Sequence, residues 1–311
     1  MRSQLQSYSK VIGEKYKKTD TITLEVEFAP QIQSILTVSL SELWKVVIRG
    51  SSYTLPLTCL LRPTKDCRVE SFDVIDLKLF TGNEPLYAGV TLLHGDRVML
   101  ADYNNYQCIL LSSSYQFITS RILTDRPWNV CVLDDQEVAL SLYNQNKIQI
   151  LSVIGDVIRP VRTITTKYSC NGIAAAGNGE MVVNSHCGND KSAWSLINTR
   201  GDVKCTHQYD SVYSDNYVAV NNTKTQVYVS VSAMNSLLCF DMDGRKQFTY
   251  SPESLKYPTG VDMDRYDNIY VLGLLSNNIH QLSPDGSVLQ VITSGVPNIS
   301  RRFAFTRVRI C

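Results

Sequence analysis

Residues 257–271, YPTGVDMDRYDNIYV, contain a short apolar strand, a polar turn and a second strand rich in β-branched and aromatic side chains. The pattern continues with a third segment, IHQL at 279–282, a Pro-Asp-Gly turn at 284–286 and a fourth segment, VLQVI at 288–292. It predicts four short antiparallel strands joined by tight turns. One such sheet cannot bury both of its faces, so several must pack face to face around an axis.

The same pattern recurs along the chain with a period of 40 to 45 residues. The central apolar residue of the first strand recurs at steps of 40, 43, 45 and 43 residues, and these landmark residues are Val90, Val130, Ile173, Val218 and Val261. The glycine of the last hairpin recurs at steps of 46, 43 and 42 residues, and these glycines are Gly155, Gly201, Gly244 and Gly286. The first copy departs, because three serines occupy residues 112–114 where a glycine is expected. Two separate landmarks that keep one period predict an all-β β-propeller.

The repeat at residues 257–271 resembles an NHL repeat, and so does VMLADYNN at residues 98–105. The whole chain resembles the C-terminal part of a tripartite-motif protein, in which a coiled coil precedes an NHL propeller. Because six blades are usual in that family, the resemblance implies a six-bladed NHL-like propeller over residues 71–311. Five blades are readable, and a sixth would start near Phe303 and stop at Cys311. Either this last blade is truncated, which we favour, or the N-terminal segment completes it.

Residues 1–70 are predicted to lie outside the propeller. Residues 1–20 are basic and predict either a helix, as the end of a coiled coil, or a disordered tail. Residues 21–70 predict a small mixed segment and linker, with a strand over 21–28, a short helix over 31–40 and a strand or helix end over 44–48. Residues 72–80 alternate in polarity as expected for the outer strand that closes the ring.

Charge and cysteine usage exclude several classes of protein. The net charge is +1, but residues 1–20 carry +3 and residues 301–311 carry +4, so the sequence between them carries about −6. A mildly acidic body argues against a broad nucleic-acid surface. No apolar run is long enough to span a membrane, and no signal-peptide core is present. The nine cysteines are scattered without a C-x-x-C pair, which predicts neither a disulfide framework nor a zinc site and favours a cytoplasmic location.

Catalytic and metal-binding patterns are weak in this sequence. The histidines fall in different blades and at different strand phases, and they are His94, His186, His207 and His280. A calcium-dependent lactonase would need several acids on the inner strands, but the inner-strand polar candidates are Asp262, Asn171 and Asn216. Asp264 shares a strand face with Asp262 but lies at the turn. We therefore expect polar residues that hydrate a central channel, no cofactor, no metal and no catalysis by this chain.

The Arg200-Gly201-Asp202 triplet matches an integrin-binding motif. It also occupies the position of a blade hairpin, where Gly and Asp are favoured for backbone reasons. We therefore expect a turn there and no integrin site.

One rim of the predicted propeller combines cations with aromatic rings. In three blades a basic residue stands beside an aromatic one where the chain enters the first strand, and loops after the second strands add two tyrosines. The predicted rim consists of Tyr103, Arg126, Trp128, Tyr143, Lys167, Tyr168, Lys256 and Tyr257. Such a rim suits a protein partner, because Trp, Tyr and Arg dominate binding hot spots. It also suits single-stranded RNA through phosphate contacts and base stacking.

The resemblance implies a recognition module that catalyses nothing itself. In the tripartite-motif family the propeller binds a protein target, and zinc-binding RING and B-box domains that are absent here lead to its ubiquitination. We therefore expect a protein-binding adaptor, with single-stranded RNA binding as the alternative and a calcium-dependent lactonase as a third reading. Self-association through the N-terminal helix or the open last blade is also expected.

Overall fold

The computed structural model describes residues 21–28, 32–39, 47–49, 85–143, 145–211, 216–264 and 266–293. The chain divides into two compact units, residues 1–63 with 309–311, and residues 64–308. The predicted N-terminal helix or tail, the ring-closing strand over 72–80 and the sixth blade lie outside the described residues.

The first unit contains a three-stranded antiparallel sheet of β1 (Thr21–Phe28), β2 (Ile32–Ser39) and β3 (Val47–Arg49), with β2 in the middle. The strand predicted over 21–28 is confirmed. The helix predicted over 31–40 is wrong, because β2 pairs without a break along all of β1, from Thr21 opposite Ser39 to Phe28 opposite Ile32. The segment IQSILTVS is rich in β-branched residues, which favour a strand once a partner strand is available.

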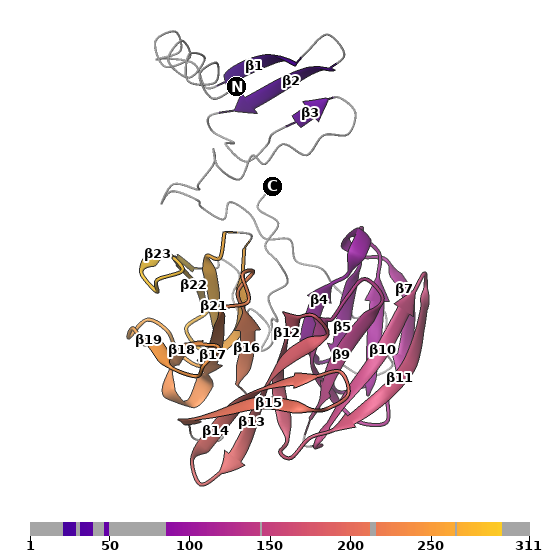
Figure 1. Cartoon of the computed structure of the whole chain (residues 1–311), viewed down its shortest axis with the longest axis vertical. Coiled ribbons are helices and arrows are strands. Elements are labelled where there is room, and N and C mark those ends of the chain that lie inside the picture. The colour runs from indigo at the N-terminus through magenta and orange to yellow at the C-terminus, as the bar shows by residue number, and fades with distance from the viewer. Residues whose placement is uncertain are drawn as a thin grey trace. The chain divides into compact units, whose positions relative to one another are not determined.

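The second unit contains five four-stranded antiparallel sheets, and Figure 1 shows these blades in chain order. Blade one holds β4 (Tyr87–Leu92), β5 (Val98–Asp102), β6 (Gln107–Leu111) and β7 (Phe117–Ile122). Blade two holds β8 (Pro127–Val132), β9 (Glu137–Leu142), β10 (Lys147–Ile154) and β11 (Val157–Thr165). Blade three holds β12 (Cys170–Gly177), β13 (Glu180–Gly188), β14 (Lys191–Asn198) and β15 (Val203–Asp210).

Blade four holds β16 (Tyr217–Val220), β17 (Gln226–Val231), β18 (Ser236–Asp241) and β19 (Lys246–Tyr250). Blade five holds β20 (Pro258–Met263), β21 (Ile269–Gly273), β22 (Asn278–Leu282) and β23 (Val288–Thr293). Two single turns of 3-10 helix, η3 (His94–Asp96) and η4 (Ser232–Met234), complete the described elements. In the described part of the chain, no helix has the length and apolar character needed to cross a lipid bilayer.

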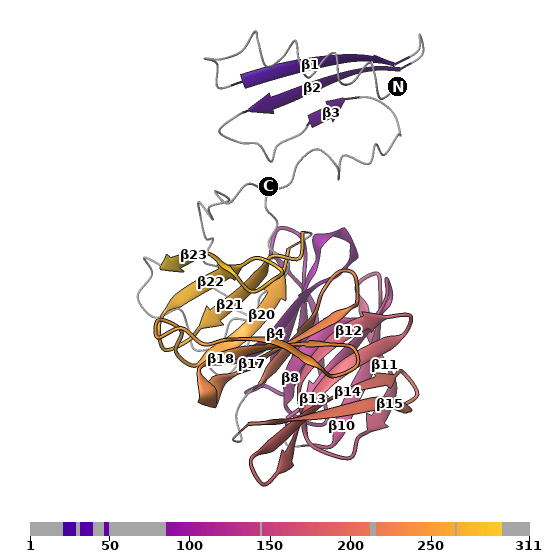
Figure 2. The same cartoon turned by 60° about the vertical axis from the view of Figure 1, so that its left-hand side comes forward.

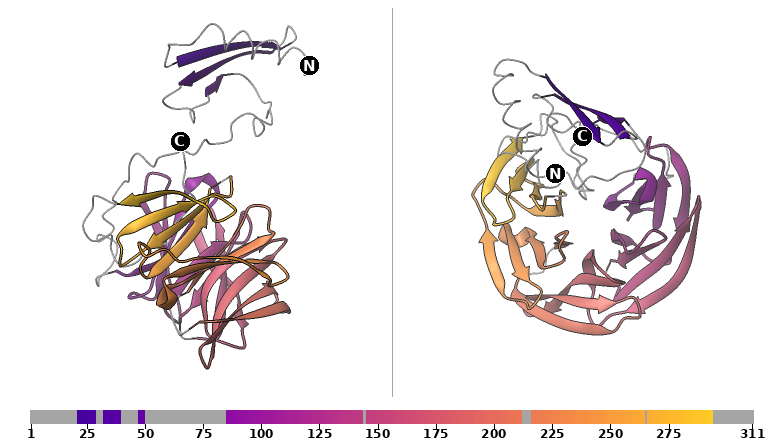
Figure 3. Two further views of the ribbon diagram at one scale, coloured as in Figure 1. Left: turned by 90° about the vertical axis from the view of Figure 1, so that its left-hand side faces the viewer. Right: turned by 45° about the horizontal axis from the view of Figure 1, so that its top comes forward.

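The five sheets surround a common centre, as the right-hand view of Figure 3 shows. The first strand of each blade lies innermost, and neighbouring inner strands β4, β8, β12, β16 and β20 pack in that order. Figure 2 shows the same blades from a second side. The all-β propeller is therefore confirmed with five described blades.

The hydrophobic core lies between the blades. The middle strands β5 and β6 of blade one are buried at every position, whereas the outer strand β7 is largely exposed. Met99 and Leu110 of blade one pack with Leu140 of blade two, and Val182 of blade three packs with Val229 of blade four. Middle strands are apolar on both faces because a neighbouring blade covers each face.

Glycine allows the closest approach between inner strands. A Cβ atom added at Gly172 of β12 would lie 2.8 Å from the main-chain nitrogen of Val218 on β16. At Gly89 of β4 it would lie 2.7 Å from the Cα atom of Asn129 on β8. Both obstacles are main chain and cannot rotate away, so these positions require glycine.

The predicted hairpin glycines are confirmed. Gly155, Gly201, Gly244 and Gly286 all have positive φ angles, which the tight turns require. In blade one the corresponding residue is Tyr115, with φ of 61°, because its nitrogen bonds to Ser112 O as the nitrogen of Gly286 bonds to Ser283 O. The Arg200-Gly201-Asp202 triplet forms the predicted turn.

Candidate functional site

The inner strands leave one edge of each blade without a strand partner, and these edges surround a pocket of about 160 Å³ at the centre of the ring. The pocket is lined by residues from all five described blades, including Thr91, Asn129, Ala175, Val220 and Asp262. This volume equals roughly five water molecules, which suits a small polar molecule. Unpaired strand edges and a few side chains make such a wall polar.

Two polar side chains enter the pocket lining from the inner strands themselves. Asn129 of β8 accepts a hydrogen bond from the nitrogen of Val130 at 2.8 Å through its Oδ1. Within the described residues, its Nδ2 group donates no hydrogen bond, so both N–H groups remain available to a ligand. Asp262 of β20 is half-buried, and its Oδ1 accepts from the nitrogen of Met263 at 2.8 Å. Asn129 and Asp262 lie on different blades, and each is therefore held by a hydrogen bond from the main-chain nitrogen of the next residue.

Lys224 brings a positive charge into the lining from the turn between β16 and β17. Its Nζ atom donates to the carbonyl of Ala175 on β12 at 3.3 Å. The same charge acts on Cys131 of β8, where burial raises the pKa to about 12 and Lys224 opposes that rise. The ammonium group of blade four therefore lies against the inner strand of blade three.

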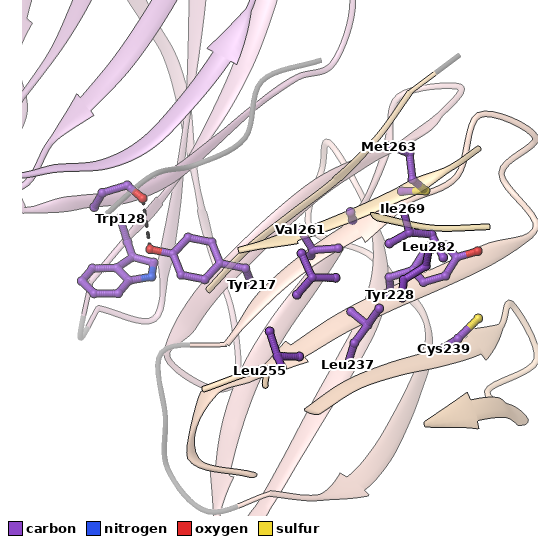
Figure 4. Close-up of a cluster of buried hydrophobic side chains, with 13 residues drawn as sticks. Trp128, Tyr217, Tyr228, Leu237, Cys239, Leu255, Val261, Met263, Ile269 and Leu282 are labelled. Carbon is purple, nitrogen blue, oxygen red and sulfur yellow. Dashed lines mark hydrogen bonds between the residues drawn. The ribbon is translucent and has the colours of Figure 1, made fainter. Parts of the chain in front are cut away.

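Tyr217 crosses the centre of the ring. Its hydroxyl donates to the carbonyl of Ala88 on β4 at 3.2 Å, although β16 lies three blades further on. Its ring stacks on Trp128 of β8, with centroids 6.3 Å apart and planes 30° apart (Figure 4). Trp128 is 1% exposed and Tyr217 is 4% exposed. These two rings form an aromatic barrier beside the pocket.

The structure brings four of the eight predicted rim residues together. The guanidinium of Arg126 donates to the hydroxyls of Tyr103 at 3.0 Å and of Tyr106 at 2.9 Å, and lies over both rings. Tyr143 contacts Tyr103 edge to face at 5.3 Å and stacks on Trp128 at 4.5 Å. Arg126 is exposed, whereas Trp128 is buried and forms the base of this cluster.

The other four rim residues form two separate pairs. Lys167 lies over the ring of Tyr168 at 5.0 Å. Lys256 is exposed, and Tyr257 receives a hydrogen bond on its carbonyl from Leu274 in the loop after β21. In blade two as well, the loop after the second strand lies beside the chain that enters the first strand, because Tyr143 N bonds to Arg126 O.

Among the polar inner-strand candidates, only Asp262 lines the pocket. Asp264 is 2% exposed and is used by its own turn, where it accepts from the nitrogens of Tyr266 and Asn268. Asn216 donates to Tyr209 and Ser211, and Asn171 is buried. The expected shared face of Asp262 and Asp264 therefore does not provide a carboxylate pair.

A calcium ion held by carboxylates does not fit these residues. Calcium takes six to eight oxygen ligands, usually with several carboxylates. Within residues 85–293 as described, Asp262 is the single acidic residue of the pocket lining, and no group of three His, Cys, Asp or Glu could hold a metal ion. The described cysteines are all free thiols.

Sequence reasoning missed Asn129, Tyr217 and Lys224. Asn129 and Tyr217 each directly precede a landmark valine, so aligning the five blades by landmark would have marked both. Lys224 lies in a polar first turn that each blade possesses, and no local signal shows that its side chain turns inward.

The SMP-30/Gluconolactonase/LRE-like region matches residues 113–305 of this sequence. The chain belongs to this family. The family includes lactonases and related enzymes, so the expectation that this chain is not an enzyme is wrong. None of the comparisons points to the tripartite-motif or NHL families.

Solved structures show the same fold at low sequence identity. Virginiamycin B lyase from Staphylococcus aureus is 14% identical with a TM-score of 0.55, over 69% of this chain and 71% of that one. A luciferin-regenerating enzyme is 15% identical with a TM-score of 0.55, over 69% and 82%. A chain of a nidogen/laminin complex is 12% identical with a TM-score of 0.56, over 88% and 94%. No curated protein matches the sequence significantly.

Proposed function

We propose that this SMP-30/gluconolactonase-type propeller is an enzyme that opens a small cyclic ester in its central pocket. The observation that carries the proposal is the joint presence of the Asp262 carboxylate and the Asn129 amide in one 160 Å³ pocket. Family membership supports the choice of reaction, because the family includes lactonases.

The chemistry needs a base and a hydrogen-bond donor. The carboxylate of Asp262 accepts a proton from water, and the water oxygen bonds to the ester carbonyl carbon. Negative charge then builds on the carbonyl oxygen, where the Nδ2 group of Asn129 donates a hydrogen bond. The ring C–O bond breaks, and its oxygen takes the proton back from Asp262. The product is a hydroxy acid.

The test measures hydrolysis of a panel of five- and six-membered sugar lactones through the acid that the reaction releases. We expect Asp262→Asn to lower kcat by about a hundredfold or more, since a positioned base contributes at least that much. Asn129→Asp keeps the acceptor for Val130 and removes the donor, and it should lower kcat by roughly a hundredfold.

Asp156→Asn is the matched control, because Asp156 is an exposed residue of the β10–β11 turn. It should retain full activity. Wild-type protein that opens no lactone, or Asp262→Asn at wild-type rates, would overturn the proposal.

Partner binding at the rim, by protein or by single-stranded RNA, stays a prediction, and so does a cytoplasmic location.

A further inference from the structure

Hydrogen bonds inside the β16–β17 turn hold this turn, which carries Lys224, in place. Asn221 is 4% exposed, and its Oδ1 accepts from the nitrogens of Thr225 and Gln226 at 2.9 and 3.0 Å. Its Nδ2 group donates to the hydroxyls of Thr223 and Thr225 at 2.9 and 3.1 Å. A side chain that makes four such bonds fixes the backbone of a turn.

The turn is also fixed to both neighbouring blades. On one side, Asn222 donates from its main-chain nitrogen and its Nδ2 to Asp267 of blade five, both at 2.7 Å. On the other side, Lys224 bonds to Ala175 of blade three and lies over Gly177, whose missing side chain leaves room for the lysine stem. The ammonium group is therefore positioned before any ligand arrives, which lowers the entropy cost of binding.

The charges of the lining are separated by blade. Asp262 is on blade five, and Lys224 extends from blade four to the inner strand of blade three. A dipolar lining of this kind orients a ligand whose two ends differ in charge. An electrophilic carbonyl suits the side of Asp262, and an anionic group suits the side of Lys224.

We propose that the pocket takes a small carbonyl compound that carries a carboxylate, and that Lys224 binds this carboxylate. The inference rests on the proposed function for the carbonyl end, and it assigns the substrate class. Because Lys224 is exposed at the pocket, it also attracts the anion during approach.

The test uses two lactones of equal ring size. D-glucaro-1,4-lactone carries a carboxylate where D-glucono-1,4-lactone carries a hydroxymethyl group. For the wild type we expect kcat/KM to be at least about tenfold higher for the anionic lactone than for the neutral one. This is the effect of one hydrogen bond to a charged group. Lys224→Met should abolish this preference, and Lys224→Arg should retain most of it. Lys246→Met, an exposed lysine of β19, should leave it unchanged.

A binding measurement separates this inference from the proposed reaction. Saturation-transfer NMR would compare D-gluconate with the neutral D-glucitol on the wild type and on Lys224→Met. Binding of D-gluconate that requires Lys224, without turnover of either lactone, supports the anion site and overturns the reaction. Turnover of both lactones at equal kcat/KM overturns the anion site and supports the proposed reaction. If the wild type neither binds D-gluconate nor opens either lactone, both the anion site and the proposed reaction are overturned.

Discussion

The hydroxyl of Tyr217 donates a hydrogen bond of 3.2 Å to the carbonyl of Ala88, and this contact joins blade four to blade one through the centre of the ring. Propeller blades normally contact only their neighbours in the ring. This tyrosine therefore couples two blades that strand packing leaves apart.

Replacing Tyr217 separates the hydrogen bond from the packing of the ring. Tyr217→Phe should reduce the free energy of unfolding by about 1 kcal/mol, and Tyr217→Ala should reduce it by about 3–5 kcal/mol because it leaves a cavity. Urea unfolding measures both. Tyr115→Phe, at an exposed turn tyrosine, should change stability by less than about 0.5 kcal/mol. A Tyr217→Phe variant as stable as the wild type would contradict the assigned hydrogen bond.

Gly172 should not tolerate a side chain. Gly172→Ala places a Cβ atom 2.8 Å from Val218 N and 3.0 Å from Asn216 O, so β12 and β16 must move apart. We expect a loss of about 1–3 kcal/mol in the free energy of unfolding, as for other overpacked sites. Gly179→Asn is the control, since nothing lies within 4 Å of a Cβ there and asparagine tolerates its positive φ. A thermal midpoint unchanged by Gly172→Ala would refute this close approach.

Two serines at equivalent positions bond one blade to the next. Ser141 Oγ of β9 donates to Asn171 O at 2.6 Å and accepts from Asn129 N, and Ser230 Oγ of β17 donates to Thr259 O. Each Ser→Ala change leaves buried main-chain groups unpaired and should cost about 1–3 kcal/mol.

The double variant of Ser141 and Ser230 should lose the sum of the two single losses, because the serines serve different blade interfaces. Chemical unfolding of the four proteins measures this. Ser120→Ala, on the exposed outer strand β7, is the control. A double variant no less stable than either single variant would contradict independent blade contacts.

His280 should make stability depend on pH. It is 0% exposed, and its Nδ1 lies 2.6 Å from the hydroxyl of Tyr250. Burial lowers the pKa of His280, and the carbonyl of Ser254 partly opposes this shift. The unfolded chain, with a histidine pKa of about 6.5, therefore binds a proton more readily than the folded one.

The contribution of neutral His280 to the free energy of unfolding should be fully present above about pH 6.5. It should be lost as the pH falls through the lower pKa that His280 has in the folded state. His280→Gln removes the titrating group and should flatten the difference between pH 8 and pH 5. The measurement is the free energy of unfolding across that range, with His94→Gln, at an exposed histidine, as the control. An identical pH profile for the wild type and His280→Gln would contradict this assignment.

The blade architecture could be predicted from the sequence because its signals are local. Each landmark residue and each hairpin glycine is set by the chain within a few residues, and four of the five hairpins have the expected glycine. The helix predicted over 31–40 is a strand because Ile32–Ser39 pairs along all of Thr21–Phe28, and the local pattern of residues 31–40 does not show this pairing.

The site was less predictable because it depends on contacts between blades. Asp262 was placed correctly on an inner strand, whereas Lys224 reaches Ala175 over a separation of 49 residues and Tyr217 reaches Ala88 over 129. Such contacts exist only after the ring has formed. The rim cluster was partly predictable, since Arg126 and Trp128 are near neighbours in sequence, but the burial of Trp128 was not.

The aromatic barrier of Trp128 and Tyr217 limits how a small molecule can reach the pocket. Both rings are almost completely buried, so small molecules do not pass between them. Within the described residues, a ligand therefore reaches the pocket without passing between Trp128 and Tyr217. Under the proposed function, product that stays in so small a pocket would compete with the next substrate for the same site.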